Sequence, residues 1–339
     1  MSEIRNQEAL LKIEDLRISF DTYAGEVQAV RGVDLELRKG EVLAVVGESG
    51  CGKTVTAQAI MQLNPSPPAR VVSGRILLED RDLVSMRERE IRRVRGGEIS
   101  MIFQDPMTSL NPTARIGRQI MEGILKHQKV SRAEARQRAL DMLRMVGISN
   151  PEERMRQYPY EFSGGMRQRV MIAMALVCNP KILIADEPTT ALDVTIQSQI
   201  IDLLLELRNK LNTTILIITH DMGVVADIAD RVAVMYAGLI VEQGTVRELF
   251  YEPAHPYTLG LLQSIPRMND RNARLVPIEG NPPDLLNPPQ GCPFAGRCSR
   301  CMRICRELPP EKTMLSGEHF VRCWLQHEYA SGQEVHHAP

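Results

Sequence analysis

The chain has 339 residues, enough for one large or two modest domains with a sizeable buried core. Its composition, 43% hydrophobic and 24% charged, is ordinary for a soluble globular protein, and a formal net charge of −1 gives no general attraction for nucleic acid. No stretch approaches the roughly 20 apolar residues of a membrane span, and the N-terminus lacks the apolar core of a secretion signal. Any membrane role is therefore expected to run through a partner.

Residues 11 to about 40 are predicted to form short strands, because the segment 33–37 alternates apolar and polar side chains. An unbroken apolar run at 42–46 follows and is typical of a buried parallel strand. Phe20 and Tyr23 are expected in the loop after the first strand. A ring there either stacks on a base or packs on the surface, and the sequence leaves both open.

The stretch 47–54, called the phosphate loop below, fits the pattern G-x-x-x-x-G-K-[ST]. It lies between a predicted strand and a predicted helix, so its N–H groups and the helix N-terminus are expected to face phosphate oxygens. Lys53 would reach the β- and γ-phosphates, and the Thr54 hydroxyl would bind Mg²⁺. The alternative is a glycine-rich turn without a ligand. The pattern predicts a nucleoside triphosphate bound by Ser49, Gly50, Cys51, Gly52, Lys53 and Thr54.

A strand pair is expected at 72–82 and a charged helix near 87–95, and the apolar strand 99–103 ends at Gln104. From 111 to 150 the periodicity is helical. Ser131 to Glu134 has the form of a capping box, and an apolar stripe follows it. The stripe consists of Ala139, Met142, Leu143 and Val146. We interpret about 105–178 as a helical insertion into an α/β core.

The following elements alternate up to about residue 250. A helix is expected at 162–175, the strand 182–187 ends in two carboxylates, a helix follows at about 196–211, and His220 follows the strand 214–219. This alternation predicts an α/β fold in which helices cover both sides of a parallel sheet.

The carboxyl ends of parallel strands converge, so the polar residues that follow the strands are expected to share one site. Asp186 is expected to bind Mg²⁺, and Glu187 to polarise the water that attacks the γ-phosphate. Gln104 and His220 follow two further strands. Each alone is weak evidence, because such residues are more often structural. Together with the phosphate loop they make four such strand ends in one chain, which indicates a nucleotide-hydrolysing site.

Beyond residue 250 the sequence changes, and repeated prolines exclude long regular elements. We place a boundary between a nucleotide-binding domain, 1–250, and a C-terminal extension, 251–339. Five of the seven cysteines crowd the extension, at Cys292, Cys298, Cys301, Cys305 and Cys323. A cytosolic nucleotide-binding protein is not expected to use these as disulfides, so a metal site is predicted.

Together the motifs of residues 11–250 resemble the nucleotide-binding subunit of ABC transporters. The phosphate loop resembles the Walker A motif, and 182–187 resembles Walker B with its catalytic glutamate. Segment 162–166 is similar to the LSGGQ signature and 191–193 to the D-loop, which contains Asp193. The remaining matches are Gln104 for the Q-loop, His220 for the switch histidine, and Phe20, ahead of Tyr23, for the aromatic ring that stacks on adenine.

The resemblance implies a head-to-tail pair of such domains, with each ATP between the Walker A motif of one and the signature of the other. Ser163, Gly164 and Gly165 would present N–H groups and a positive helix end to the γ-phosphate of the opposite site. Phe162 and Met166 depart from the signature pattern, but the serine and glycines that would contact phosphate are present. Mg²⁺ would be held through Thr54, Gln104 and Asp186, with Glu187 and His220 as catalytic residues.

A finer resemblance indicates the dipeptide, oligopeptide and nickel importers, most closely the dipeptide type. Segment 101–112 is similar to their extended Q-loop, and the run His255-Pro256-Tyr257-Thr258 is similar to their C-terminal extension. The branch implies two permease subunits, a second related ATPase subunit in a hetero-pair, and indirectly an extracytoplasmic solute-binding protein, with no nucleic acid. It also implies a peripheral position on the cytoplasmic face of the inner membrane.

Members of this branch are expected to carry a [4Fe-4S] cluster on cysteines spaced like Cys292, Cys298, Cys305 and Cys323. Tetrahedral Zn²⁺ on the same thiolates is the alternative. Cys301 either displaces one of these ligands or stays unused.

The sequence thus predicts an ATP-hydrolysing subunit of an ABC importer that couples ATP binding and hydrolysis to peptide uptake. The alternatives are an importer ATPase for nickel or another small solute, and a non-transport ABC-type ATPase acting on DNA or ribosomes. A single GKT, a short interval between the Walker motifs and the near-neutral charge disfavour the non-transport class.

Overall fold

The structure, a computed structural model, describes residues 8–105, 109–190, 193–264 and 277–327. It contains two compact units. One includes Arg38–Val42 and Ser85–Ile218, and the other includes Ala9–Leu37, Leu43–Val84 and the described residues after Thr219. Within the described ranges, no helix is long and apolar enough to cross a membrane.

The first unit contains the parallel strands β6 (Ile99–Ile102), β7 (Ile182–Asp186) and β8 (Thr214–Thr219), with β7 in the middle. Every residue of these strands is buried, as their unbroken apolar runs require. The predicted parallel strands are confirmed here. β6 ends at Ile102, one residue earlier than expected, and the following residue Phe103 is exposed.

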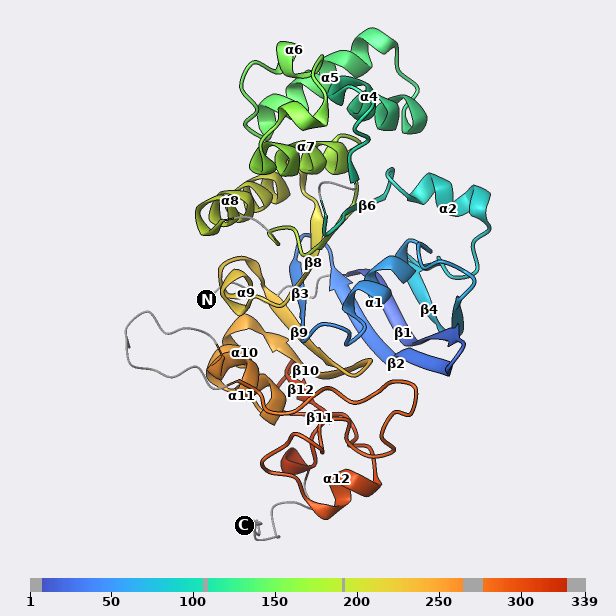
Figure 1. Cartoon of the computed structure of the whole chain (residues 1–339), viewed down its shortest axis with the longest axis vertical. Helices are drawn as coiled ribbons and strands as arrows, with labels where there is room; N and C mark the ends of the chain where they lie inside the picture. The colour runs from blue at the N-terminus through green and yellow to red at the C-terminus, as the bar shows by residue number, and fades with distance from the viewer. Residues whose placement is uncertain (1–7, 106–108, 191–192, 265–276, 328–339) are drawn as a thin grey trace. The chain divides into compact units, whose positions relative to one another are not determined.

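The helices predicted in this unit are also present, and Figure 1 shows α4 to α7 gathered in one group. The Ser131 hydroxyl accepts the Glu134 N–H at 3.2 Å and begins α5, whose predicted apolar stripe is buried. The predicted segments at 106–108 of the Q-loop and 191–192 of the D-loop lie outside the described residues. The helices are α2 (Glu88–Val94), α4 (Ile116–His127), α5 (Arg132–Met145), α6 (Pro151–Arg154), α7 (Gly164–Leu176) and α8 (Val194–Leu211).

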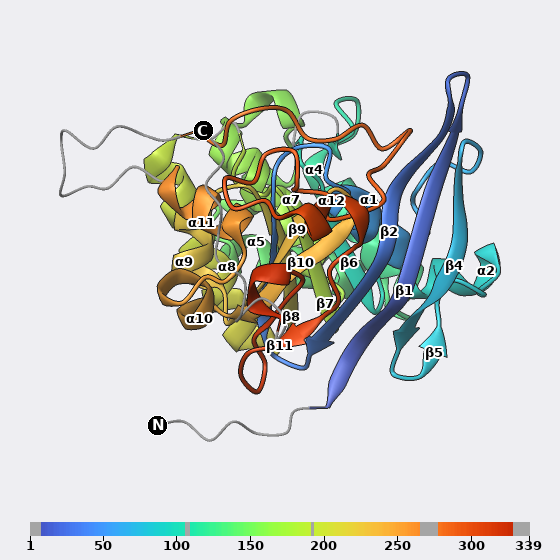
Figure 2. The same cartoon turned by 90° about the horizontal axis from the view of Figure 1, so that it is seen from below.

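The second unit contains an antiparallel sheet in the order β2-β1-β4-β5, whose strands lie side by side in Figure 2. Its strands are β1 (Ala9–Thr22), β2 (Gly25–Arg38), β4 (Ala69–Leu78) and β5 (Arg81–Asp82). The prediction of short strands was wrong, because β1 and β2 each have 14 residues. A bulge at Asp15, with φ 40°, shifts the register of β1 and interrupts the alternation that would show a long strand.

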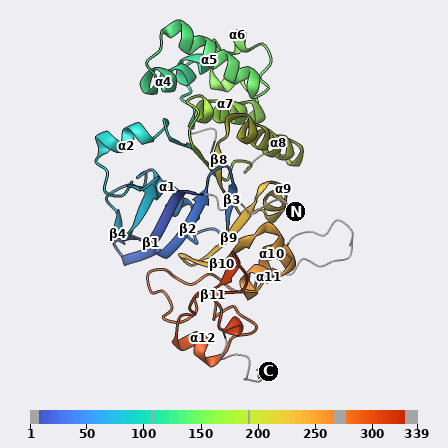
Figure 3. The ribbon, with the colours of Figure 1, turned by 180° about the vertical axis from the view of Figure 1, so that it is seen from behind.

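The same unit contains β3 (Val42–Val46), which pairs in parallel with β9 (Arg231–Tyr236). β10 (Leu239–Thr245) pairs antiparallel with β9, and the two are labelled next to each other in Figure 3. β12 (Phe320–Val321) pairs with β10, and β11 (Thr313–Met314) pairs with β12. The unit's helices are α1 (Lys53–Ile60), α9 (Met222–Ile228), α10 (Val246–Tyr251), α11 (Pro256–Gln263) and α12 (Arg303–Glu307). Described helices after residue 250 have at most eight residues, as the prolines predict.

Candidate functional site

The phosphate loop connects β3 to α1, which confirms the predicted strand–loop–helix context. Lys53 is 6% exposed, and its ammonium donates to the carbonyl oxygens of Gly47 at 2.7 Å and Glu48 at 2.9 Å. A Cβ added at Gly47 would lie 2.2 Å from the carbonyl oxygen of Met235, so the close approach of β9 requires glycine. The loop therefore curls around its lysine.

The other predicted ATP-binding residues of the loop differ in exposure. Ser49 and Gly50 are exposed, Thr54 is half-buried, and Gly52 precedes α1 with φ 105°. The Cys51 thiol is buried, and burial raises its pKa, while its carbonyl accepts the Gly238 N–H at 2.9 Å. Cys51 thus contributes its backbone to the loop and keeps a neutral side chain inside.

The carboxylates predicted for Mg²⁺ and for water activation lie in the first unit. Asp186 is the last residue of β7 and is 2% exposed. Glu187 follows with φ 47°, and its N–H donates to the carbonyl oxygen of Ile218 at 2.8 Å. Its carboxylate accepts from the Gln104 amide and the Thr190 hydroxyl, both at 2.9 Å. Two residues predicted from separate motifs, Gln104 and Glu187, are therefore in contact.

The residues of the signature and of the D-loop begin two helices. The Ser163 hydroxyl accepts the Met166 N–H at the start of α7, and the Asp193 carboxylate accepts the Ile196 N–H at 2.9 Å at the start of α8. Gly164 is exposed, and a Cβ at Gly165 would lie 3.1 Å from Ile196 of α8. The first N–H groups of α7 are thus available to a negatively charged group.

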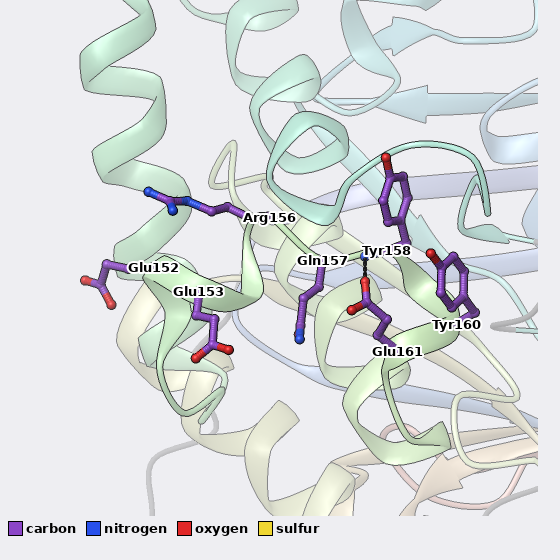
Figure 4. A pocket seen from close by; sticks show the side chains of 7 residues that line it. All are labelled: Glu152, Glu153, Arg156, Gln157, Tyr158, Tyr160 and Glu161. Carbon is purple, nitrogen blue, oxygen red and sulfur yellow. Dashed lines mark hydrogen bonds between the residues drawn. The ribbon is translucent and has the colours of Figure 1, made fainter.

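A short turn at Pro159–Glu161 precedes α7 and is closed by a hydrogen bond and a stack of two rings. The Glu161 carboxylate accepts the Tyr158 N–H at 2.7 Å, and the rings of Tyr158 and Tyr160 stack with centroids 5.6 Å apart. Figure 4 shows this turn beside a hollow. Its lining residues are Glu152, Glu153, Arg156, Gln157, Tyr158, Tyr160 and Glu161. None of the residues predicted for the ATP site lines it.

The remaining predicted site residues lie in the second unit. His220 is exposed and precedes Asp221, whose carboxylate accepts the Gly223 N–H at 2.8 Å and begins α9. Phe20 was expected in a loop, but it lies on β1, which runs to Thr22, and it forms the last pair of the β1–β4 register, opposite Ala69. Tyr23 is fully exposed in the turn between β1 and β2.

Residues of the C-terminal extension that hold the phosphate loop were not predicted. Arg297 and Tyr257 both bind Glu48 of the loop. The only sequence signal was the run around His255-Pro256-Tyr257, whose physical role the sequence does not show.

A buried network of hydrogen bonds holds the run His255-Pro256-Tyr257 in position. The Glu242 carboxylate, fully buried in β10, accepts the N–H groups of Ala254 at 2.7 Å and His255 at 2.9 Å, and it lies 2.8 Å from Nε2 of His319. The His255 ring accepts the Tyr257 N–H at 3.0 Å and begins α11. Burial lowers the pKa of His255 to about 3, so its ring is neutral at physiological pH.

The cysteines of the extension lie near one another. Burial raises the pKa of Cys292 and of Cys323 to about 12, and the thiols of Cys298 and Cys305 add to both shifts. All seven cysteines of the chain are described and carry free thiols. Within the described ranges, however, no group of three or more His, Cys, Asp or Glu side chains is arranged to hold a metal ion. The structure does not support the predicted metal site.

Comparisons with known proteins identify the family to which the sequence is similar. A family model described as "ABC transporter" matches residues 30–190, and one described as "Oligopeptide/dipeptide transporter, C-terminal region" matches residues 241–305. The chain is 56% identical to the dipeptide transport ATP-binding protein DppD of Bacillus subtilis, over 95% of this chain and 96% of that protein. It is 59% identical to the oligopeptide transport ATP-binding protein OppD of the same organism, over 94% of this chain and 89% of that protein.

A solved structure extends this likeness to the fold. The ATP-binding cassette MJ0796, determined as a dimer in a post-hydrolysis state bound to ADP and Pi, matches with a TM-score of 0.63 at 26% identity. The match covers 70% of this chain and 99% of that one.

Proposed function

This chain belongs to the family of ATP-binding subunits of ABC transporters for dipeptides and oligopeptides, and we propose how its residues serve ATP-driven peptide import. The chain is the ATPase subunit of such an importer. The observation that carries this function is identity of 50% or more to peptide-transport ATPases along nearly the whole chain, extension included.

ATP binds with its phosphates against the phosphate loop. Lys53 contacts the β- and γ-phosphates, and the first N–H groups of α1 support them. Mg²⁺ binds through Thr54, Gln104 and Asp186, the adenine stacks on Phe20, and Glu187 and His220 act on the attacking water. The contact of Gln104 with Glu187 supports this assignment, because it couples a metal-binding side chain to the catalytic carboxylate.

The γ-phosphate of the partner's site meets Ser163, Gly164 and Gly165, with Asp193 beside it. The exposed start of α7 supports this role, because its N–H groups lack partners inside the helix. The partner is a second, related ATPase subunit, and both dock on two permease subunits at the cytoplasmic face of the inner membrane. An extracytoplasmic binding protein delivers the peptide to these permeases.

The assembled importer tests this proposal. Membrane vesicles that contain the complex, with the ATPase side accessible, are supplied with MgATP, and transport of radiolabelled dialanine is measured in parallel with phosphate release. ATP-dependent transport that is lost in Lys53→Ala is the expected result. Transport of Ni²⁺ but not of dialanine or a longer peptide would overturn the peptide assignment.

We further propose that the cysteine segment of the extension holds a [4Fe-4S] cluster on Cys292, Cys298, Cys305 and Cys323. The support is their spacing and the closeness of their thiols, since Cys298 and Cys305 contribute to the raised pKa of both Cys292 and Cys323. Iron, acid-labile sulfide and zinc are measured per chain after anaerobic purification. About four iron and four sulfide are expected. A content of one zinc per chain would show a structural zinc ion in place of the cluster. A chain without any metal would overturn the proposed site.

A further inference from the structure

The phosphate loop is held by an ion pair to the C-terminal extension. Arg297 donates from Nη1 to one carboxylate oxygen of Glu48 at 2.5 Å and from Nη2 to the other at 2.9 Å. The pair is therefore bidentate, the geometry in which guanidinium and carboxylate bind most strongly. The two residues are 249 positions apart in the chain, yet both belong to the second unit.

The surroundings of Arg297 leave its guanidinium no freedom to turn away. The other N–H groups donate to the carbonyl oxygens of Glu279 at 2.9 Å and Ile278 at 3.0 Å and to the Tyr236 hydroxyl at 3.3 Å. All five N–H donors of the guanidinium are thus used. The side chain is 5% exposed, so the site is built for arginine, and a lysine cannot reproduce the fork.

A second contact holds the backbone of the same loop residue. The Tyr257 hydroxyl accepts the Glu48 N–H at 2.8 Å. The Tyr257 ring is fully buried against the rings of Tyr236 and Phe294, with centroids 4.6 and 5.4 Å away. The position of Glu48 is therefore fixed through both its side chain and its main chain.

The position of Glu48 sets the position of the phosphate-binding lysine, because the Lys53 ammonium donates to the Glu48 carbonyl oxygen at 2.9 Å. We propose that Arg297 and Tyr257 are positioning residues for ATP, which hold the phosphate loop in its binding conformation and neutralise the Glu48 carboxylate. This inference rests on the proposed binding of ATP at the loop. It gives the extension a part in ATP binding, because Arg297 and Tyr257 both belong to the extension.

The charge of Glu48 predicts how a second substitution would change the affinity for ATP. Without Arg297 the Glu48 carboxylate, 27% exposed, lacks its counter-ion next to the place where the ATP phosphates bind. The uncompensated charge repels the phosphates. Removing that charge as well, in Arg297→Ala combined with Glu48→Gln, is expected to recover part of the lost affinity. A merely structural role of Arg297 would not produce this recovery.

The experiment titrates the purified full chain with MgATP by calorimetry. Arg297→Ala is expected to raise Kd roughly tenfold, and Tyr257→Phe, which keeps the ring but loses the acceptor, by a smaller factor. Arg231→Ala is the matched control. It breaks the ion pair of Arg231 and Glu318, at 3.4 Å and with 7% and 23% exposure, in the same unit. Its Kd is expected to stay near that of the wild type.

Steady-state ATPase assays of the assembled importer add a second readout. In Arg297→Ala the KM for ATP is expected to rise with little change in kcat, because Glu187 and His220 are unchanged. A wild-type Kd in both Arg297→Ala and Tyr257→Phe, or an equal loss in Arg231→Ala, overturns the inference. If Arg297→Ala does not fold, Tyr257→Phe decides alone. A wild-type chain that does not bind MgATP overturns the proposed function instead.

Discussion

The phosphate loop and the turn at Glu187 are both expected to act on ATP, but different contacts hold them. The phosphate loop is fixed by Arg297, whose side chain is 5% exposed, and by the buried residues Tyr257 and Lys53. The Glu187 carboxylate accepts bonds from the side chains of Gln104 and Thr190, and the bond from Gln104 is exposed.

The difference matches two tasks. A site that binds phosphates gains affinity when its donors are held in place before the ligand arrives. A carboxylate that is to polarise water has to exchange a protein partner for that water, and an exposed bond to a neutral amide costs little free energy to exchange. Substitutions in both regions test this contrast.

Glu187→Gln is expected to lower kcat for ATP hydrolysis by about 10²–10⁴-fold, because the amide cannot polarise water as the carboxylate does. The Kd for MgATP and the stability of the fold should hardly change, since an amide oxygen can still accept from Gln104 and Thr190. Phosphate release at saturating ATP measures the effect. Glu206→Gln, which alters an exposed carboxylate paired with Lys210, is the control. Undiminished hydrolysis in Glu187→Gln would refute the catalytic assignment.

Gly47→Ala tests how rigid the phosphate loop is. The new Cβ would meet the carbonyl oxygen of Met235 at 2.2 Å in a backbone with φ 152°. Strain and overpacking together are expected to reduce the free energy of unfolding by about 3 kcal/mol. Gly40→Ala, with φ 77° and no atom within 4 Å of its Cβ, isolates the strain alone and should lose about 1–2 kcal/mol. Equal losses in urea unfolding would show that the loop can move away from β9.

The buried His255, which begins the helix that contains Tyr257, predicts that the stability of the fold depends on pH. The folded pKa of His255 is about 3, below its unfolded value near 6.5, so below pH 6.5 only the unfolded chain takes up this proton. Stability is therefore lost as the pH falls from about 6.5, by at most about 1.4 kcal/mol per pH unit from this group. His255→Asn keeps a side-chain acceptor at the start of α11 and removes the titration. Urea unfolding at pH 7 and pH 5 should show a smaller loss in the variant, and identical losses would contradict the prediction.

Local patterns predicted much of the fold. The apolar runs of β3, β7 and β8, the cap at Ser131 and the phosphate loop all appear where the sequence places them, because each depends on neighbouring residues. The length of β1 was missed because the bulge at Asp15 interrupts the alternation that identifies a strand. Phe20 was placed in a loop for the same reason.

The candidate catalytic residues were predicted from motifs, but the side chains that contact them were not predicted. Nothing in the sequence near Gln104 shows that its amide meets Glu187, 83 residues later. The run around His255 was recognised only as similar to a family's extension, while the structure shows it positioning Tyr257. The cysteine spacing predicted a metal site, and because no metal-holding group of side chains is found among the described residues, that site stays a proposal.

Patterns of residues close together in the chain are enough to predict the residue types that ATP chemistry requires. The same kind of pattern predicts the strands and helices that carry these residues. Only the tertiary structure decided which side chains hold the phosphate loop. Glu48 reads as a variable position of the loop pattern, and Arg297 as one basic residue in a cysteine-rich tail. Their contact arises because chain folding brings residues 249 positions apart into one buried cluster, and no local pattern records such a distance.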